Sequence, residues 1–271
     1  MAGGHSRDAV PPGAIPLDDR GLLLGDGLFE TLLFTRGELV LAEAHARRMI
    51  DGAAVLGLPA PTAADIVGCA LAAVRAAGLS EARGAVRVTL TAGSGGRGLD
   101  RPAALEPRLF ATAALSARPD SAAALFIAQT RRNQASPASR LKTLAYLDNV
   151  LARREAVAAG ADEAVMLNTL GEVACAAAAN LFWLNDGVLL TPAPETGRMD
   201  GVMARQVADA AVALGIEARH VREGAEALDG ADAVFLTNSL IGVRPAFLVG
   251  QAPPAPNALV ERLTAAVSGF V

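Results

Sequence analysis

Residues 163–191 consist of short apolar runs separated by sequences that are typical of tight turns. The clearest turn is Asp186-Gly187, because an Asp-Gly pair between two apolar runs is a strong signal for a β-hairpin. The second half of the chain is therefore expected to be rich in strands. The strands predicted here span residues 163–167, 172–175, 181–184 and 188–191.

The first part of the chain also predicts paired strands, together with helices. The turn Thr35-Arg36-Gly37-Glu38 lies between two apolar runs, 28–34 and 39–41, which indicates a hairpin. Asp65 follows three residues after Thr62, a spacing that resembles a capping box at the start of a helix. We expect helices at 43–56 and 62–78 and strands at 84–91 and 108–114.

Proline and charge at Arg118-Pro119-Asp120 mark a domain boundary, which predicts an N-terminal domain of residues 1–118 and a C-terminal domain of residues 119–271. Hairpins outnumber alternating strand and helix units, so we predict an α+β fold of two α/β domains with mainly antiparallel sheets. The further elements expected are strands at 123–130, 216–220 and 233–236, helices at 201–214 and 258–268, and a helix up to Gly160 that carries an apolar stripe of Leu144, Leu147, Leu151 and Ala158.

Composition excludes several classes of function. A net charge of −4 and a pI near 5.5 provide no basic surface for a nucleic acid. Two cysteines cannot build a disulfide framework or a structural zinc site, which is typical of a cytoplasmic protein. Residues 1–16 lack the apolar core of a signal peptide, and no run approaches 18 apolar residues, so we expect no membrane segment.

Lys142 is the only lysine in the chain, whereas the other 23 basic residues are arginine. Arginine can replace lysine in most ion pairs, but a guanidinium stays protonated and cannot form an imine. A buried lysine amine can lose its proton and attack a carbonyl group. The sequence therefore predicts a Schiff-base lysine, with chance survival in an arginine-rich chain as the alternative.

Three further signals are ambiguous by themselves. The glycine-rich segment 93–98 lacks the lysine and hydroxyl of a P-loop, but its Arg97 offers either a carboxylate-binding fork or a solvated loop side chain. Arg47 and Arg48 form a pair that most often lies on a solvated helix face. A helix that starts at Gly201 would present free N–H groups to an anion.

Several motifs occur in a shared order between about residues 17 and 249. They are Asp19-Arg20-Gly21, Gly25-Asp26-Gly27-Leu28-Phe29-Glu30-Thr31, Glu43-Ala44-His45-Ala46-Arg47-Arg48, Lys142-Thr143-Leu144, Asn180-Leu181-Phe182-Trp183, Asp200-Gly201-Val202-Met203 and Thr237-Asn238-Ser239-Leu240. Together they resemble the class IV (fold type IV) pyridoxal-phosphate enzymes. That family includes D-amino-acid and branched-chain aminotransferases and 4-amino-4-deoxychorismate lyase, and the last is the most similar.

The resemblance implies a cofactor, pyridoxal 5′-phosphate (PLP), bound between two domains of a homodimer. Lys142 would be the catalytic Schiff-base residue, and Phe29 and Arg97 would contact a small-molecule substrate. The residues expected to contact the cofactor are Arg48, Lys142, Cys175, Val202, Met203, Asn238 and Ser239.

One of these positions departs from the family pattern. Cys175 stands where the family has a glutamate that keeps the pyridine nitrogen of PLP protonated. Glu172 would lie on the opposite face of a strand and could not replace it. Transamination should suffer most from this loss, whereas elimination of pyruvate from 4-amino-4-deoxychorismate is assisted by the aromatic ring that it creates.

The sequence thus favours a cytoplasmic lyase of folate biosynthesis that releases 4-aminobenzoate and pyruvate. An aminotransferase for branched-chain or D-amino acids is the alternative, and a binding protein without catalysis is a third possibility. Ala145 and Tyr146, where lyases commonly have Asn-Arg, count against the lyase.

Overall fold

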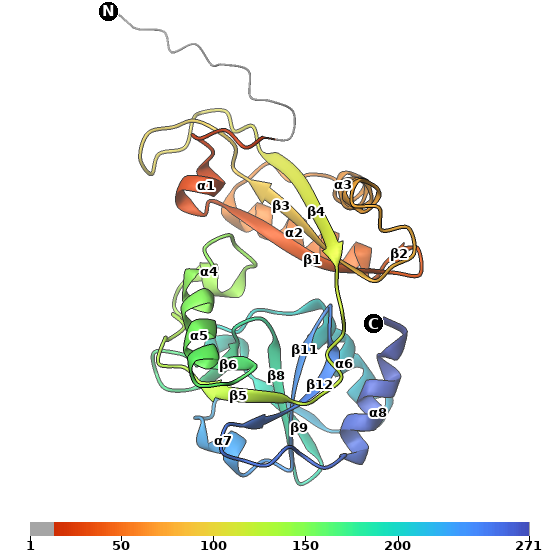
Figure 1. Cartoon of the computed structure of the whole chain (residues 1–271). Coiled ribbons are helices and arrows are strands. Elements are labelled where there is room, and N and C mark those ends of the chain that lie inside the picture. The colour runs from red at the N-terminus through yellow and green to blue at the C-terminus, as the bar shows by residue number, and fades with distance from the viewer. Residues whose placement is uncertain (1–13, 271) are drawn as a thin grey trace, which may run out of the picture.

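A computed structural model describes residues 14–270, and the segment 1–13, most of the N-terminal stretch considered above, lies outside the described residues. The first part forms a four-stranded antiparallel sheet in the order β2-β1-β3-β4 (Figure 1). Helices α2 and α3 pack on one face of this sheet through alternate apolar residues of β1 and β3. The elements are α1 (Arg20–Leu24), β1 (Gly27–Thr35), β2 (Glu38–Leu39), α2 (Ala42–Leu56), α3 (Ala63–Ala76), β3 (Gly84–Thr91) and β4 (Arg108–Leu115).

The second part forms an eight-stranded mixed sheet in the order β10-β9-β8-β11-β12-β5-β6-β7. Three of its neighbouring pairs are parallel, namely β10 with β9, β12 with β5 and β5 with β6. The strands are β5 (Ala123–Ile127), β6 (Glu163–Leu167), β7 (Val173–Ala176), β8 (Asn180–Asn185), β9 (Val188–Pro192), β10 (Ala218–Val221), β11 (Ala233–Asn238) and β12 (Gly242–Leu248).

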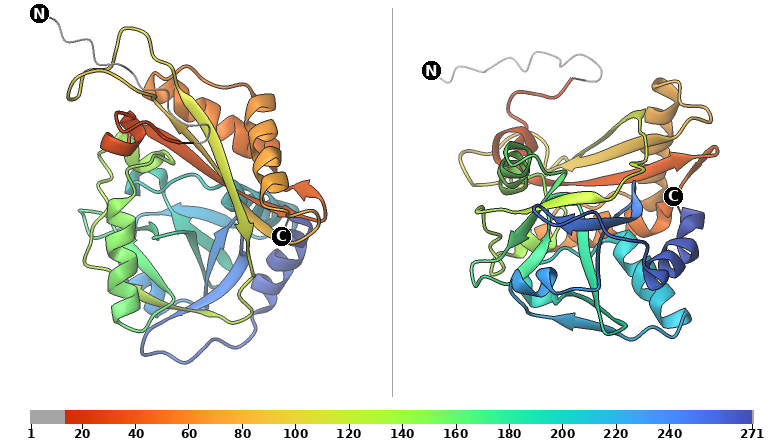
Figure 2. Two further views of the ribbon diagram at one scale, coloured as in Figure 1. Left: turned by 45° about the horizontal axis from the view of Figure 1, so that its top comes forward. Right: turned by 60° about the horizontal axis from the view of Figure 1, so that its bottom comes forward.

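Helices cover the large sheet at its sides, as the views in Figure 2 show. The helix α6 (Val202–Ala213) and the helix α8 (Ala258–Ala266) bury Phe182, Phe235 and Val243 beneath them. The helix α5 (Leu147–Ala158) packs on β5 and β6 through small residues. The remaining short helices are α4 (Pro137–Arg140), α7 (Glu226–Asp229) and the two 3₁₀ turns Pro194–Thr196 and Ser268–Phe270.

The α+β fold class is confirmed. The capping box at Thr62 is present, with Thr62 and Asp65 bonded reciprocally. Both predicted hairpin turns place two consecutive residues at positive φ, Arg36-Gly37 and Asp186-Gly187, as the right-handed twist of paired strands favours. The boundary predicted at residue 118 falls in the linker between β4 and β5, and the division into two domains stays a prediction.

Three elements were not predicted correctly from the sequence. The glycine-punctuated segment at 19–27 contains α1, which Asp19 caps by accepting bonds from the N–H groups of Gly21 and Leu22. No strand was predicted at β12, which pairs with β11 and β5. The helix α5 begins at Leu147 rather than Leu144, because residues 142–144 pair with the start of β1 instead.

The burial of α5 also differs from the predicted stripe. Its buried residues are Asn149, Ala152 and Ala156, whereas Leu147 and Leu151 are exposed. Small residues let the helix approach the sheet closely, so the larger apolar side chains face outward.

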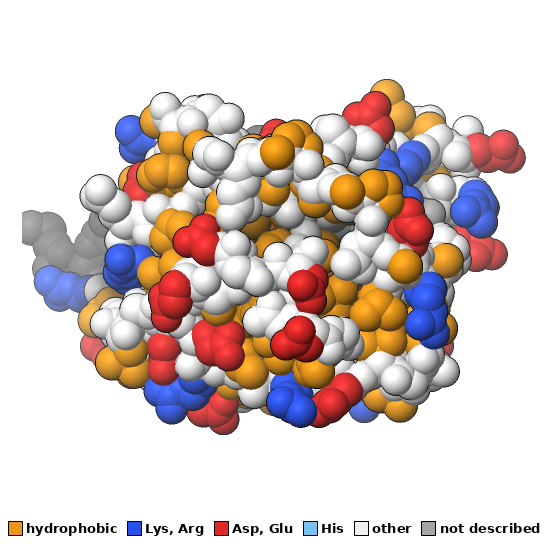
Figure 3. Space-filling model, turned by 90° about the horizontal axis from the view of Figure 1, so that it is seen from below, with side chains coloured by type: hydrophobic (Ala, Val, Ile, Leu, Met, Phe, Trp, Pro, Cys, Tyr) orange, Lys and Arg blue, Asp and Glu red, His pale blue; other side chains and the backbone are white. Residues whose placement is uncertain are grey.

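None of the helices described between residues 14 and 270 has the length and apolar character that crossing a bilayer would need. On the face shown in Figure 3, acidic side chains lie across the middle and basic ones mainly toward the edge.

Candidate active site

A cavity of about 300 Å³ lies between the two sheets. Strands β1 and β3 and helix α2 contribute one wall, and the loops at the edge of the large sheet contribute the other. The lining residues are Phe29, Thr31, Arg48, Arg87, Lys142, Tyr146, Ala178, Ala179, Asn180, Met199, Gly201, Val202, Met203, Asn238, Ser239 and Leu240. Among residues 14–270, three cations and no carboxylate line this cavity.

Backbone pairing fixes the position of Lys142. The carbonyl oxygen of Lys142 accepts a hydrogen bond from the N–H of Phe29 at 2.9 Å, and the N–H of Leu144 donates to Gly27 at 3.0 Å. The lysine therefore lies on a short extended segment that is held against the first strand of the small sheet. Its Nζ is 4.2 Å from the centre of the Phe29 ring.

The surroundings of Lys142 favour the neutral amine. Its pKa is lowered to about 8, first by burial and next by the positive charge of Arg48, while Glu30 acts in the opposite direction. Half of the amine is then uncharged near pH 8, which suits a nucleophile and a proton carrier.

Arg48 connects the two walls of the cavity. Its guanidinium makes a bidentate contact with Glu30, at 2.7 Å from Nε to Oε1 and 2.6 Å from Nη2 to Oε2. Nη1 donates to the carbonyl of Asp200 at 3.0 Å. Burial by itself would raise the pKa of Glu30, but Arg48 and His45 outweigh it and lower that pKa to about 2. A pair of arginines on a helix usually lies on a solvated face. Here these contacts instead fix Arg48 in the wall of the cavity.

The N-terminus of α6 forms the opposite end of the cavity. Gly201 precedes this helix, and in the described structure no side chain caps its first turn. The first N–H groups, including those of Val202 and Met203, are free to bind an anion. Gly201 is required here because a Cβ would overlap the Oδ1 atom of Asn180, whose Nδ2 donates to Met199.

Ser239 and Asn238 complete this end of the cavity. Asn238 shapes the loop, since its Oδ1 accepts bonds from the N–H groups of Leu240 and Ile241. Its Nδ2 donates to the carbonyl of Ala178 at 3.0 Å, which ties two lining segments together. The Oγ of Ser239 lies 3.1 Å from Nε2 of His45.

The sequence motifs gave no site role to Arg87, Thr31 or Tyr146. Arg87 is paired with Thr31 across β1 and β3, so both point to the same face as Phe29. Its guanidinium lies 3.6 Å from the centre of the Phe29 ring, and burial lowers its pKa. An arginine between the apolar residues Val86 and Val88 of the predicted strand was the available signal. Tyr146 packs edge-on against Phe29 at 5.0 Å, and burial raises its pKa.

Two predicted site residues do not line the cavity. Cys175 lies on β7 opposite Met166, where it is buried among alanines that pack under α5, and burial raises its pKa. Arg97 lies in an exposed loop that buried Arg20 holds by donating to the carbonyls of Leu99 and Asp100. Glu172 is bonded to Asn168 and Arg222 instead of facing the cavity.

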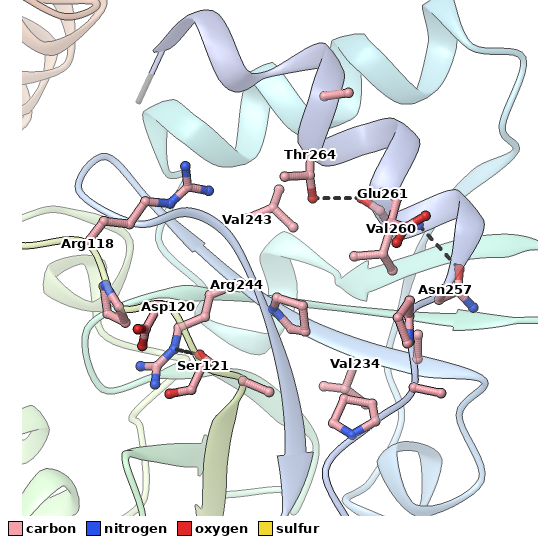
Figure 4. Close-up of a pocket in the computed structure, with 18 of the residues that line it drawn as sticks. Arg118, Asp120, Ser121, Val234, Val243, Arg244, Asn257, Val260, Glu261 and Thr264 are labelled. Carbon is pink, nitrogen blue, oxygen red and sulfur yellow. Dashed lines mark hydrogen bonds between the residues drawn. The ribbon is translucent and has the colours of Figure 1, made fainter.

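A larger cavity of about 740 Å³ lies between the linker before β5, the strand β12 and the helix α8 (Figure 4). Prolines, alanines and valines supply much of its lining. Arg244 points toward the linker there, and its Nε donates to the carbonyl of Ser121 at 2.8 Å. Among the described residues, its lining contains no lysine, cysteine or histidine, so the chemistry is expected at Lys142.

The family model for amino-transferase class IV matches residues 27–247, a range that contains every residue of the cavity. The chain belongs to the class IV aminotransferase family. It is therefore a PLP-dependent enzyme that acts on small molecules.

Named members of this family fall into two groups. The aminodeoxychorismate lyase of Vibrio harveyi is 28% identical over 244 residues, which cover 88% of each chain. The branched-chain-amino-acid aminotransferase of Pseudomonas aeruginosa is 29% identical over 212 residues, covering 75% of this chain and 68% of that protein. The solved structure of 4-amino-4-deoxychorismate lyase from Pseudomonas aeruginosa is 30% identical, covers 97% of both chains and has a TM-score of 0.82.

The residues of the cavity fit the cofactor of this family. The lowered pKa of Lys142 suits an amine that reacts with an aldehyde. Arg48, Ser239 and the uncapped start of α6 all line the cavity and could hold a phosphate group. When bound, PLP supplies an electron sink for the substrate carbon next to nitrogen.

Proposed function

We propose that the enzyme is a PLP-dependent lyase that converts 4-amino-4-deoxychorismate to 4-aminobenzoate and pyruvate. The observation that carries this proposal is the set of charges in the cavity. With the phosphate assigned to Arg48, Ser239 and α6, the cation Arg87 is left for the substrate. Two carboxylates make 4-amino-4-deoxychorismate a suitable ligand for such a cavity, and the names of relatives support the same reaction.

Arg87 is placed to bind a substrate carboxylate. Its stacking on Phe29 fixes the plane of the guanidinium, and Arg87 has no acidic partner among the ion pairs of the described residues. A planar fork of this kind binds a carboxylate with two parallel hydrogen bonds. In this role Arg87 orients the substrate with its amino group toward Lys142.

Lys142 carries the proton in the proposed reaction. Its neutral amine would accept the proton whose loss makes the substrate ring aromatic, and would return a proton to the group that leaves as pyruvate. Within this one cavity Lys142 is the cation with a pKa low enough for both steps, since the guanidinium of arginine stays protonated.

The missing glutamate supports a lyase over an aminotransferase. No carboxylate among residues 14–270 lines the cavity, and Cys175 lies in an apolar cluster under α5. A cofactor ring without an acidic partner is a weaker electron sink. Elimination that yields an aromatic product tolerates a weaker sink better than amino-group transfer does.

Transamination of apolar amino acids is the second candidate. Phe29 and Tyr146 form an aromatic wall beside Lys142, which would suit a branched apolar side chain. The aminotransferase relative supports this candidate as well.

One assay separates the two candidates. The purified enzyme with PLP is given 4-amino-4-deoxychorismate, and both pyruvate and 4-aminobenzoate are measured over time. Parallel reactions contain a branched-chain or a D-amino acid with 2-oxoglutarate. Equal release of both products, absent in Lys142→Ala, supports the lyase. Efficient amino-group transfer without pyruvate release from 4-amino-4-deoxychorismate would overturn it.

We further propose that the enzyme acts in the cytoplasm, in folate biosynthesis, as a homodimer. An apolar surface, here called the α1–α5 face, supports the dimer. It consists of exposed Leu22, Leu23 and Leu24 of α1 and Leu147, Val150 and Leu151 of α5. The end of α1 lies near the segment that leads into α5, because a Cβ at Gly25 would be 3.2 Å from the backbone nitrogen of Ala145. Exposed apolar patches of this kind commonly mark protein interfaces.

The loop that carries Arg97 borders the α1–α5 face. Leu99 is exposed in this loop, and its carbonyl accepts a bond from Arg20 of α1. We propose that the dimer brings Arg97 of each subunit to the cavity of the other, where it would contact the substrate.

A further inference from the structure

A chain of hydrogen bonds runs from the core of the small sheet into the cavity. His45 Nδ1 lies 2.7 Å from Glu30 Oε2, and both side chains are only 1% exposed. His45 Nε2 lies 3.1 Å from the Oγ of Ser239, which lines the cavity. The buried imidazole therefore bridges a carboxylate and a hydroxyl, and the hydroxyl faces the proposed phosphate site.

Counting hydrogens along this chain leaves two possible states. Glu30 is ionised and only accepts, so His45 Nδ1 must carry a hydrogen. In the neutral imidazole Nε2 then accepts, and the single hydrogen of Ser239 is donated to it. In the imidazolium Nε2 donates to Ser239, and the serine hydrogen is free to point into the cavity.

A phosphate dianion discriminates between these states. Its oxygens are acceptors, so Ser239 can bond to it only by donating its hydrogen. The charges also favour the imidazolium: Glu30 and Arg48 sum to zero, and a proton on His45 makes the cluster positive. Before the dianion enters, the Glu30 carboxylate that accepts from His45 Nδ1 also accepts two bonds from Arg48, so its negative charge is already balanced.

We infer that binding of the PLP phosphate draws one proton from solvent onto Nε2 of His45 and turns the Ser239 hydroxyl from His45 to the phosphate. This inference rests on the phosphate placement in the proposed function. No covalent bond forms or breaks at either residue. The charged group in contact with the imidazole is Glu30 on β1, which also contacts Arg48 on the helix that carries His45, and Lys142 lines the same cavity as Ser239.

Calorimetry of PLP binding to the Lys142→Ala variant tests the inference, since this variant removes the proton exchange of the lysine. Titrations near pH 8 in two buffers of different ionisation enthalpy give the number of protons taken up. The phosphate, with a second pKa of about 6, is already a dianion there. We expect about one proton per PLP in Lys142→Ala and about none when His45→Gln is added. Glutamine can still bond to Ser239 but cannot take up a proton.

A phosphate-free ligand is the matched control. We expect 5′-deoxypyridoxal, which has the same ring and aldehyde, to bind more weakly and without proton uptake. PLP binding without uptake would overturn the inference and leave the proposed phosphate site intact. Equal binding of PLP and 5′-deoxypyridoxal would overturn both.

Nitrogen NMR supplies a readout that does not depend on the folding of the His45 variant. The chain has three histidines, so the ring nitrogens of the Lys142→Ala protein can be resolved and followed. We expect His45 Nε2 to change from an acceptor nitrogen to an N–H on addition of PLP. An Nε2 that is protonated before PLP, or unprotonated after it, contradicts the inference.

Discussion

At the scale of single residues, the proposed chemistry depends on Lys142, whose position is fixed by backbone pairing and whose pKa is lowered by burial and neighbouring charges. Phe29 holds the lysine segment through its N–H, and the Phe29 ring lies beneath both Lys142 and Arg87. One aromatic residue of β1 thus positions the proposed nucleophile and the proposed carboxylate-binding group.

The lowered pKa of Lys142 predicts the pH dependence of cofactor attachment. The neutral amine is the nucleophile, and its fraction rises with pH through a pKa of about 8. We expect the rate of covalent PLP attachment to the apoprotein to rise tenfold per pH unit at low pH and to level off above about pH 8. The rate is measured from the absorbance of the bound cofactor in stopped-flow mixing.

A control variant and one contrary outcome test the predicted pH dependence. The Lys142→Ala protein serves as the control and should show no covalent attachment after borohydride reduction. A rate that still climbs steadily to about pH 10, as for an ordinary lysine, would contradict the lowered pKa.

Replacing Arg87 should weaken substrate binding more than cofactor binding. A lost charge-assisted bidentate contact costs about 1.5–3 kcal/mol, so Arg87→Ala should raise KM for 4-amino-4-deoxychorismate by about 10- to 100-fold. The PLP affinity should change little, because Arg87 belongs to the proposed substrate end. Steady-state kinetics and a PLP titration check the two effects, with exposed Arg75→Ala of α3 as the control. An unchanged KM would remove Arg87 from the substrate site.

At the scale of elements, the helix α6 and the loop after β11 form the proposed anion-binding end of the cavity. The helix can approach Asn180 only because Gly201 has no side chain. The missing cap of α6 leaves its first N–H groups for a ligand instead of for a side chain of the enzyme.

Substitution of Gly201 should therefore damage both stability and cofactor binding. In Gly201→Ala the new Cβ collides with Asn180, which we expect to lower the free energy of unfolding by about 1–3 kcal/mol. The displaced helix start should also reduce PLP affinity by about tenfold or more. Denaturant unfolding and PLP titration measure the two effects.

Gly68 of α3 offers a matched control. A Cβ there meets nothing within 4 Å, and the residue is helical, so Gly68→Ala should stabilise the protein by about 0.5–1 kcal/mol. If Gly201→Ala behaves like Gly68→Ala, the close approach of Asn180 does not govern the site.

At the scale of the whole molecule, the cavity exists only where the two sheets meet. Three contacts join the part of the chain with the small sheet to the part with the large sheet. They are the backbone pairing at residues 142–144, the contact of Arg48 with Asp200 and the contact of Arg83 with Leu240. The exposed leucines of α1 and α5 belong to the α1–α5 face, a second surface that is separate from the cavity.

A charge on the α1–α5 face should break the proposed dimer. We expect Leu23→Glu and Val150→Glu to be monomers in light scattering after size exclusion, because an unpaired charge is costly in an apolar interface. Val212→Glu, at an exposed position of α6, should leave the dimer unchanged. A wild-type protein that is already monomeric would contradict the proposal.

Subunit mixing tests whether Arg97 serves the neighbouring cavity. Neither Arg97→Ala nor Lys142→Ala should be active by itself. If each active site combines Lys142 of one subunit with Arg97 of the other, mixed dimers regain one intact site and the equimolar mixture reaches about a quarter of wild-type activity. No recovery despite verified subunit exchange would place Arg97 outside the neighbouring site.

The sequence by itself determined the features that depend on local chemistry. Turn residues at Asp186-Gly187 and the cap at Thr62 specify their elements through the backbone, so these predictions were correct. The single lysine also pointed to Lys142, because arginine cannot form an imine. The motif around Arg48 identified a residue that the structure places in the cavity.

Tertiary structure decided what depends on the relative position of distant segments. Arg87 lines the cavity because β3 pairs with β1. Cys175 does not line it, because β7 packs this residue against β6. The apolar stripe of α5 suggested a buried face, but the small residues on its other side allowed the closer approach to the sheet. Side-chain spacing defines the faces of an element, whereas packing against its neighbours decides which face is buried.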